Sequence, residues 1–274
     1  EKLDFLVHLG DTSYNDDGKD LNGYRKKWKE LLADPGYRAL LPTSGSYFTW
    51  DDHEIINNYN PETIDSKLIK AGKQAFFETL PVERGPNDRL WNRYTWGKTA
   101  EVFILDCRSE RKPSTRNNSD AIYISKAQMQ WLKDGLKNSK AHFKILLNSV
   151  PITNMPIIWL KADDRWEGYK AQREELLNHI VDNKIKNVWF LTGDFHVGFV
   201  SKVEEKGKWS GLREIAVGPS GSGYNPLGLS ELAMPKSQFE YRSSEREVVT
   251  TLLFDPVANT VHVRFVNSKD NKVL

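Results

Sequence analysis

Four apolar, strand-like stretches of this chain each end in polar residues of the kinds that bind metal ions. The first stretch, Phe5–Leu9, runs into Gly10 and Asp11, and the last, residues 188–191, runs into Thr-Gly-Asp-Phe-His at 192–196. Ligands of an open α/β sheet collect in the crevice outside the carboxyl ends of its strands. The repetition therefore predicts an α/β fold in which several strand ends converge on one site.

The remaining sequence pattern alternates helices with strands and then becomes purely β. Helices are predicted at 21–32, 66–79, 125–136 and 169–181, and strands between them at 46–50, 94–96, 101–106 and 143–148. A capping box formed by Ser125 and Gln128 begins the third helix. The last predicted elements are strands alone, at 214–217, 248–254 and 261–266. This order favours a layered α/β sandwich, and the lack of any linker-like segment predicts one domain over residues 1–274.

Composition excludes several classes of protein. A formal net charge of +2 argues against a binder of long nucleic acids or of membrane surfaces. No apolar run approaches the length that spans a bilayer, so we expect no integral membrane segment. Cys107 is the only cysteine, which rules out an intrachain disulfide. Phosphate-binding glycine loops of the P-loop and Rossmann patterns are also absent.

Asp11 and Tyr14 form the first candidate ligand pair. Asp11 lies one residue past Gly10 at a strand end, where a carboxylate can reach two cations at once. Tyr14 follows in the same loop, and ferric iron lowers the pKa of a tyrosine enough to favour a phenolate ligand. An Asx-turn with an aromatic anchor explains the same residues without a metal. This motif alone leaves both interpretations open.

The run Asp51-Asp52-His53-Glu54 places three carboxylates and an imidazole in four residues. Such charge density repels itself unless cations or basic partners are near, although the solvated first turn of a helix also favours acidic residues. The preceding aromatic residues at 47–50 indicate partial burial and favour the metal interpretation. Asn57 and Asn58 follow, either as ligands or as capping residues.

Further candidates come from three other segments. Asp194 and His196 lie at i and i+2 of an extended segment, and a carboxylate with an imidazole suits Fe, Mn, Zn or Ca. Asn148 ends another strand and offers an amide oxygen to the substrate, or serves as a turn residue. Arg108 and Arg111 are candidates for phosphate binding, with surface salt bridges as the alternative. The glycine-rich run 218–223 is expected to be a plain loop whose serines lack a histidine partner.

Taken together, these motifs resemble the alkaline phosphatase D (PhoD-like) family of metallophosphoesterases. The resemblance rests on His8-Leu9-Gly10-Asp11-x-x-Tyr14, Trp50-Asp51-Asp52-His53-Glu54-x-x-Asn57-Asn58, Leu105-Asp106-Cys107-Arg108 and Leu191-Thr192-Gly193-Asp194-Phe195-His196, with Trp166-Glu167-Gly168-Tyr169 and Arg173 as a weaker match. It implies a metallophosphoesterase-like four-layer α/β/β/α sandwich. It also implies two metal ions, Fe³⁺ and Ca²⁺, with Zn²⁺ or Mn²⁺ as alternatives.

The resemblance implies a role for each candidate. Asp11 would bridge the metals, Tyr14 and His196 would complete the iron side, and Asp194 would bind the second metal. Asp52 and Asn57 compete for one ligand position, while His53 contacts the phosphate or protonates the leaving group. The family's first metal-bearing strand should precede Asp11, so we expect the domain to be N-terminally incomplete. Membership would also imply an extracellular or periplasmic protein.

The predicted reaction is hydrolysis of phosphomonoesters, phosphodiesters or both by a metal-activated water at a two-metal site. The long loops 107–124 and 151–167 would form a groove for a second ester substituent. Trp159 and Trp166 in the second loop allow apolar leaving groups, although core packing is the commoner use of tryptophan. The contrasting hypothesis is a catalytically impaired domain of the same fold that binds phosphate or metal without turnover.

Overall fold

The computed structural model describes residues 3–155, 164–243 and 245–274. Within these residues the main sheet has seven strands in the order β3-β4-β5-β6-β8-β7-β9. Their bounds are β3 Asn92–Trp96, β4 Ala100–Ile104, β5 Phe143–Leu147, β6 Val188–Thr192, β7 Gly198–Lys202, β8 Arg213–Val217 and β9 Phe239–Ser243. The central strands β4, β5, β6 and β8 run parallel, while β3 and β7 pair antiparallel with their neighbours.

Two strand pairs form a second β layer against this sheet. Strands β1 (Phe5–Leu9) and β2 (Gly45–Thr49) run parallel, whereas β10 (Val248–Asp255) and β11 (Thr260–Asn267) form an antiparallel hairpin. Apolar side chains of both pairs share one core with side chains of β4, β5, β6 and β8. The two β layers therefore pack face to face.

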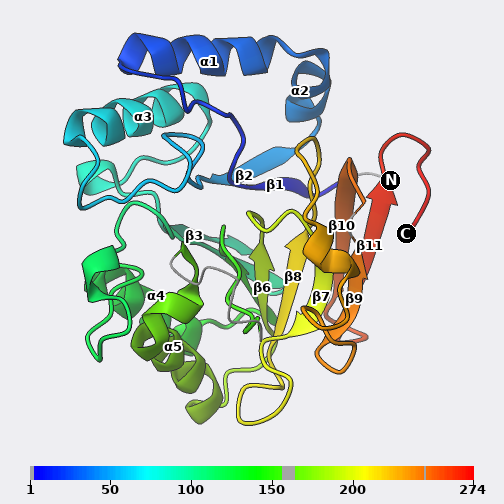
Figure 1. Cartoon of the computed structure of the whole chain (residues 1–274). Helices are drawn as coiled ribbons and strands as arrows, with labels where there is room; N and C mark the ends of the chain where they lie inside the picture. The colour runs from blue at the N-terminus through cyan, green and yellow to red at the C-terminus, as the bar shows by residue number, and fades with distance from the viewer. Residues whose placement is uncertain (1–2, 156–163, 244) are drawn as a thin grey trace.

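Helices lie on the outer sides of the β1–β2 pair and of the main sheet (Figure 1). The helices α1 (Leu21–Ala33), α2 (Pro35–Leu40) and α3 (Ser66–Thr79) lie with β1 and β2, and α4 (Lys126–Asn138) and α5 (Lys170–Asp182) lie against the main sheet. Short 3₁₀ turns occupy Leu41–Thr43, Pro86–Asp88, Pro113–Thr115, Trp166–Tyr169 and Pro226–Leu229.

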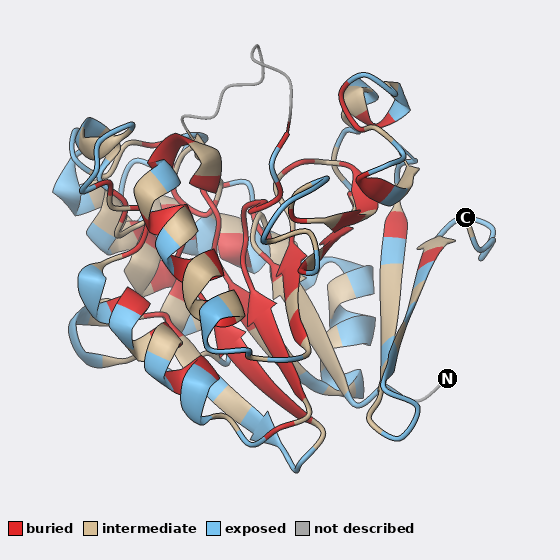
Figure 2. Cartoon of the chain, turned by 90° about the horizontal axis from the view of Figure 1, so that it is seen from below, coloured by how far each residue is buried: buried red, intermediate tan, exposed pale blue. Residues whose placement is uncertain are grey.

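Strand β4 illustrates why the layers stack in this way. Val102 and Ile104 belong to the core between the β layers. Phe103 packs in the other core, between the main sheet and the helices α4 and α5. Successive side chains of a strand point to opposite faces, and every residue of β4 is buried, so the strand must be covered on both faces. Figure 2 shows the buried central strands enclosed by helices and loops that are more exposed. The predicted mixed α/β sandwich is confirmed.

Two details differ from the sequence-based expectation. Strand β7, the edge strand β9 and the short helix α2 were not predicted. The capping box is only half formed, because the Ser125 hydroxyl accepts the N–H of Gln128 at 3.2 Å but the Ser125 N–H donates to Glu110 at 3.0 Å. The Gln128 amide instead donates to the carbonyl oxygen of Asp106 and to the carboxylate of Glu110.

The tryptophans give no support to an apolar groove. Trp166 is fully buried and packs in the core between the main sheet and its helices, while Trp159 lies outside the described residues. The described helices include none with the length and apolar character needed to cross a bilayer.

Candidate metal centre

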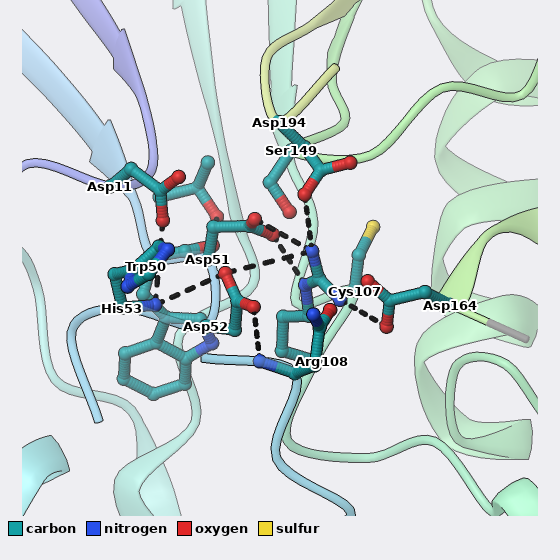
Figure 3. Close-up of polar contacts among 12 residues, drawn as sticks. Asp11, Trp50, Asp51, Asp52, His53, Cys107, Arg108, Ser149, Asp164 and Asp194 are labelled. Carbon is teal, nitrogen blue, oxygen red and sulfur yellow. Dashed lines mark hydrogen bonds and ion pairs between the residues drawn. The ribbon is translucent and has the colours of Figure 1, made fainter. Parts of the chain in front are cut away.

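Loops that follow β1, β2 and β6 deliver acidic and imidazole groups to one cavity of about 730 Å³. Its lining includes Asp11, Asp52, His53, Asp194 and His196, all of them predicted site residues. The potential ligand atoms of Asp11, Asp52 and His53 lie within 4.8 Å of one another, as do those of Asp51, Asp52 and Asp194. Figure 3 shows the acidic side chains and His53 gathered at this point. The cluster forms a candidate metal site.

The backbone of these loops is strained at several candidate ligands. Asp11, Asp194 and His196 have φ values of 54°, 56° and 56°, in the left-handed region that non-glycine residues seldom adopt. A Cβ on Gly10, whose φ is +98°, would lie 2.4 Å from the Cβ of Asp51, so glycine is required where the two loops meet. Strain of this kind concentrates at functional sites.

Glu54 joins the loops that follow β1 and β2. Its buried carboxylate accepts backbone N–H groups from Asp11 at 3.2 Å, from Thr12 at 2.5 Å and from Asp51 at 2.8 Å. Hydrogen bonds to a buried carboxylate are short and strong. Glu54 therefore sets the separation of Asp11 from the Asp51–Asp52 pair without lining the cavity.

Arg108 is the buried counter-charge of the cluster. Its Nε and Nη2 atoms bind the two carboxylate oxygens of Asp51 at 2.6 and 2.7 Å, and Nη2 also lies 2.7 Å from Asp194. Its Nη1 atom pairs with Asp164. Arg108 is fully buried and, among the described residues, is not part of the cavity lining, which instead contains Arg111. Neither a surface salt bridge nor a direct substrate contact matches this placement.

The acidic groups respond to this environment in opposite ways. Burial, followed by the charge of Glu54 and other carboxylates, raises the pKa of Asp11 to about 9. Asp52 is also buried, yet Arg108 and the Asn58 N–H, at 2.5 Å, hold its pKa down to about 2. At neutral pH the metal-free site therefore keeps a proton on Asp11, where a bound cation would relieve the same repulsion.

His53 is oriented by Asp16, a residue that the sequence analysis missed. The His53 Nδ1 atom lies 2.8 and 2.9 Å from the two carboxylate oxygens of Asp16, which also accepts the Asn57 N–H at 2.6 Å. The Tyr14 ring lies over His53 with a centroid separation of 4.1 Å. Asn57 is exposed on the cavity lining. Asp16 lies in an ordinary polar loop, so no sequence signal marked it.

Tyr14 and His196 are linked through the glycine-rich loop. The Ser222 hydroxyl lies 3.4 Å from the His196 Nε2 atom and also hydrogen-bonds to Tyr14. The expectation that these serines lack a histidine partner was therefore wrong. Burial lowers the pKa of His196, which favours the neutral imidazole that binds metals. Burial and the Asp11 charge raise the pKa of Tyr14 to about 12 in the absence of a metal.

Asp106 and Asn148, which end the predicted strands 101–106 and 143–148, lie in the core and do not line the cavity. Asp106 accepts the indole N–H of Trp50 at 2.8 Å, and the amide oxygen of Asn148 accepts from Cys107 and from Trp166, both at 2.9 Å. These contacts place Asn148 away from the cavity lining. Sequence reasoning could not foresee them, because the partners of Asn148 lie 41 and 18 residues away.

Ser149 is a second residue that the sequence analysis missed. Its hydroxyl is fully buried and has no hydrogen-bond partner among the described residues. Figure 3 places it beside Asp194, and its carbonyl oxygen accepts the N–H of Gly193 at 2.9 Å. A buried hydroxyl without a partner next to a carboxylate cluster is a candidate oxygen ligand for a cation.

Comparison with known proteins agrees with this geometry. The family model of PhoD-like phosphatases matches residues 1–253. This chain belongs to the PhoD-like phosphatase family. A curated member, alkaline phosphatase D of Bacillus subtilis (strain 168), is 28% identical over 257 residues, which cover 74% of this chain and 43% of the relative. The chain thus spans less than half the length of that relative.

Solved structures share the fold at lower identity. A structure of PhoD superposes with a TM-score of 0.76 at 22% identity, covering 97% of this chain and 63% of that protein. A purple acid phosphatase from yellow lupin seeds gives 0.63 at 16% identity, over 99% of this chain and 45% of that one. GAP50 of Plasmodium, described as the anchor in the inner membrane complex, gives 0.55 at 16% identity, over 99% and 76%. These similarities establish the metallophosphoesterase-like fold.

Proposed function

We propose that this chain catalyses metal-dependent hydrolysis of phosphate esters. The observation that carries the proposal is the convergence of Asp11, Asp52, His53, Asp194 and His196 on one cavity from loops far apart in the sequence. The raised pKa of Asp11 supports it, because this carboxylate is held in surroundings that favour a cation. Membership of the PhoD-like family supports the same reaction class.

The residues present fit two metal ions, for which we propose Fe³⁺ and Ca²⁺, with Zn²⁺ or Mn²⁺ as alternatives. Asp11 would bridge them, Tyr14 and His196 would hold the iron, and Asp194 with Asp52 or Asn57 would hold the second ion. The close approach of the carboxylates and the unpartnered Ser149 hydroxyl support this assignment. The chemistry supplied by such a pair is activation of water and neutralisation of charge that develops on the phosphate.

The chain's own residues would position the ester and move its proton. His53 lines the cavity and would donate a proton from Nε2 to the leaving oxygen, because Nδ1 is occupied by Asp16. Asp16 is then a positioning residue that keeps the imidazole in one orientation. Phosphomonoesters and phosphodiesters both remain substrates in this proposal. The ratio of activity on a bis-aryl phosphate to activity on a mono-aryl phosphate would assign the class.

The experiment that tests the proposal is hydrolysis of an aryl phosphate by the metal-loaded chain and by an Asp11→Asn variant. We expect loss of bound metal and of turnover in Asp11→Asn, because one carboxylate oxygen of the bridge is replaced by an amide nitrogen. The exposed neighbour Asp17, which pairs only at the surface with Lys27, provides Asp17→Asn as the matched control. Full activity with normal metal content in Asp11→Asn would refute the proposal.

A catalytically impaired phosphate- or metal-binding domain is the second candidate function. The ion pairs of Arg108 with Asp51 and Asp194 favour it, since a guanidinium already neutralises carboxylates that a second metal would need. A related fold serves as an anchor in GAP50, by the description of that protein. Binding of metal or inorganic phosphate by calorimetry, without hydrolysis under Fe, Ca, Zn or Mn, would establish this alternative.

An extracellular or periplasmic location is also proposed, on family membership alone. Fractionation of the source cells, followed by detection of the protein with an antibody, tests it.

A further inference from the structure

We propose that Tyr224 is a specificity-determining residue of the cavity, whose ring stacks against a planar aromatic group in the alcohol part of the phosphate ester. The substrate class is then phosphate esters of alcohols that carry an aromatic ring. This inference rests on the proposed function and deepens it, because it names the substrate class of the same cavity. Tyr224 is not one of the candidate metal ligands and takes no part in the proton transfer assigned to His53.

Tyr224 is an exposed aromatic residue in the wall of the cavity. It lines the same cavity as the candidate metal ligands, and 41% of its surface is exposed. Its ring belongs to none of the three apolar clusters that the described residues form. Burial of an aromatic ring is strongly favourable. A ring left open to the cavity is therefore a surface that an apolar group of a bound substrate can cover.

The loop that carries Tyr224 is fastened to the loop of His196 on both sides of the tyrosine. Two residues before Tyr224, the Ser222 hydroxyl lies 3.4 Å from the His196 Nε2 atom. One residue after it, the Asn225 backbone N–H donates to the His196 carbonyl oxygen at 3.0 Å, and the Asn225 side-chain amide donates to the Phe195 carbonyl oxygen at 3.2 Å. These contacts fix the tyrosine beside the candidate metal centre before a substrate binds, which lowers the cost of ordering it.

A guanidinium group supports the Tyr224 ring from outside the cavity. The Arg246 guanidinium carbon lies over this ring, 5.0 Å from its centre, where a cation is attracted by the negative face of the π system. Tyr224 belongs to the cavity lining and Arg246 does not, so the guanidinium lies on the side of the ring away from the cavity. A planar group can therefore stack on the cavity side of the ring while Arg246 keeps its place.

The size and the apolar wall of the cavity suit an aromatic alcohol. A volume of about 730 Å³ is far larger than one phosphate group needs and lies in the range of pockets for whole small molecules. Phe195 and Pro226 line the cavity together with Tyr224. A saturated ring would bury a similar area against them but has no π face. Offset stacking of two aromatic rings should therefore favour the aromatic alcohol about three- to tenfold.

The test compares benzyl phosphate with cyclohexylmethyl phosphate, which differ only in whether the six-membered ring is aromatic. The leaving group of each is a primary alcohol, so the two esters have similar intrinsic reactivity. Phosphate release by the metal-loaded full chain gives kcat/KM for each. We expect the wild type to prefer benzyl phosphate about three- to tenfold, mainly through a lower KM. The 2-phenylethyl and 3-phenylpropyl phosphates, each with its cyclohexyl counterpart, extend the reach of the ring from the phosphate.

Three variants assign the preference to the ring of Tyr224. Tyr224→Leu keeps an apolar side chain without a π face, so it should hydrolyse the aromatic and the saturated ester with nearly equal efficiency. Tyr224→Phe keeps the ring and should retain the wild-type preference. Leu229→Ala is the matched control, because Leu229 is 71% exposed in the same connection between β8 and β9 and does not line the cavity. It should keep the wild-type preference.

The possible outcomes distinguish this inference from the proposed function. Hydrolysis without an aromatic preference at any linker length, or with a preference unchanged in Tyr224→Leu, would overturn the role of Tyr224 and leave the hydrolase assignment standing. If no ester is hydrolysed, the proposed function fails, and calorimetry with benzylphosphonate and cyclohexylmethylphosphonate decides. Tighter binding of benzylphosphonate that is lost in Tyr224→Leu supports the stacking. Equal binding of the two phosphonates, or binding of neither, overturns it.

Discussion

Arg108 is the residue whose removal should damage the folded state most. Its side chain is fully buried, and its bidentate partner Asp51 is 1% exposed, with N···O distances of 2.6 and 2.7 Å. Replacing Arg108 by Met fills a similar volume but leaves Asp51, Asp52 and Asp194 without their shared counter-charge. Breaking a buried ion pair by removing one partner costs about 3–5 kcal/mol, because the remaining charge is uncompensated.

The expected consequence is a loss of about 3–5 kcal/mol in the free energy of unfolding for Arg108→Met. For a chain of this size that corresponds to a fall of roughly 10 °C in Tm. Urea unfolding in the presence of chelator, followed by tryptophan fluorescence, measures this difference in the free energy of unfolding. The comparison requires that the wild type and the variant have equal m-values. The matched control is Arg84→Met, because the Arg84 side chain is 45% exposed in a surface pair with Asp88, so the change should alter stability by less than about 0.5 kcal/mol.

The pair itself is tested by a second change at its partner. In Arg108→Met with Asp51→Asn, one uncompensated charge is removed, so we expect about 1–3 kcal/mol of the lost stability to return. The Arg84 side chain is 45% exposed, and the same comparison with Asp88→Asn should show no such recovery. A loss below about 1 kcal/mol in Arg108→Met, or a double variant no more stable than the single one, would refute the role given to this buried pair.

Three further predictions concern the site. The pKa of Asp11 is raised to about 9 in the metal-free fold, so the folded state binds more protons than the unfolded state between about pH 4 and pH 9, and stability falls as pH rises through that window. Asp11→Asn should therefore gain stability relative to the wild type in chelator as pH rises from about 5 to about 9, and a difference that does not change with pH would contradict this. Asp16→Asn should lower kcat on an aryl phosphate by roughly 10- to 100-fold with KM within about twofold, since Asp16 acts through His53, and a change confined to KM would count against it. Cys107 is fully buried and burial raises its pKa, so the thiol should resist thiol reagents until the chain unfolds. The Cys107→Ser variant should bind as much metal as the wild type. Rapid labelling of the native protein would contradict this prediction, because it would show that the thiol is accessible.

Local sequence patterns predicted most elements of the fold. The strand Phe5–Leu9 and the helix Ser66–Thr79 have the predicted bounds, because apolar runs, capping residues and prolines define them locally. The strands β7 and β9 escaped prediction because both are short, and β9, at the edge of the sheet, pairs with the much earlier residues of β7. Gly198 in β7 also weakens the strand pattern, although a Cβ there would lie 2.9 Å from the Phe265 ring.

The candidate site shows the same difference between residues marked by local sequence patterns and residues defined by distant partners. Strand-end residues such as Asp11, Asp52, Asp194 and His196 were predicted to meet, and the structure brings them to one cavity, while their roles as ligands stay predictions. Residues that act through distant partners could not be read from the sequence. Arg108 binds partners 57 and 86 residues away, and Asp16 lies 37 residues from His53.

The extent of burial is what the sequence could not supply for Arg108 and Asn148. Arg108 and Asn148 were expected near the substrate because their residue types suit phosphate and metal chemistry. Both are fully buried: Arg108 binds Asp51, and the amide oxygen of Asn148 accepts from Cys107, while its Nδ2 group has no hydrogen-bond partner among the described residues. Most buried polar groups are hydrogen-bonded, and their partners are set by tertiary structure.

The central claim is that the acidic and imidazole cluster holds metal ions that support phosphoester hydrolysis. Elemental analysis of the chain purified without chelator, alongside hydrolysis of an aryl phosphate by the same sample, tests it most directly. The account predicts bound metal, with iron and calcium each near one equivalent, and turnover that is lost when chelator removes them. A sample that takes up no metal, or that hydrolyses the ester equally well after the metals are removed, would contradict it.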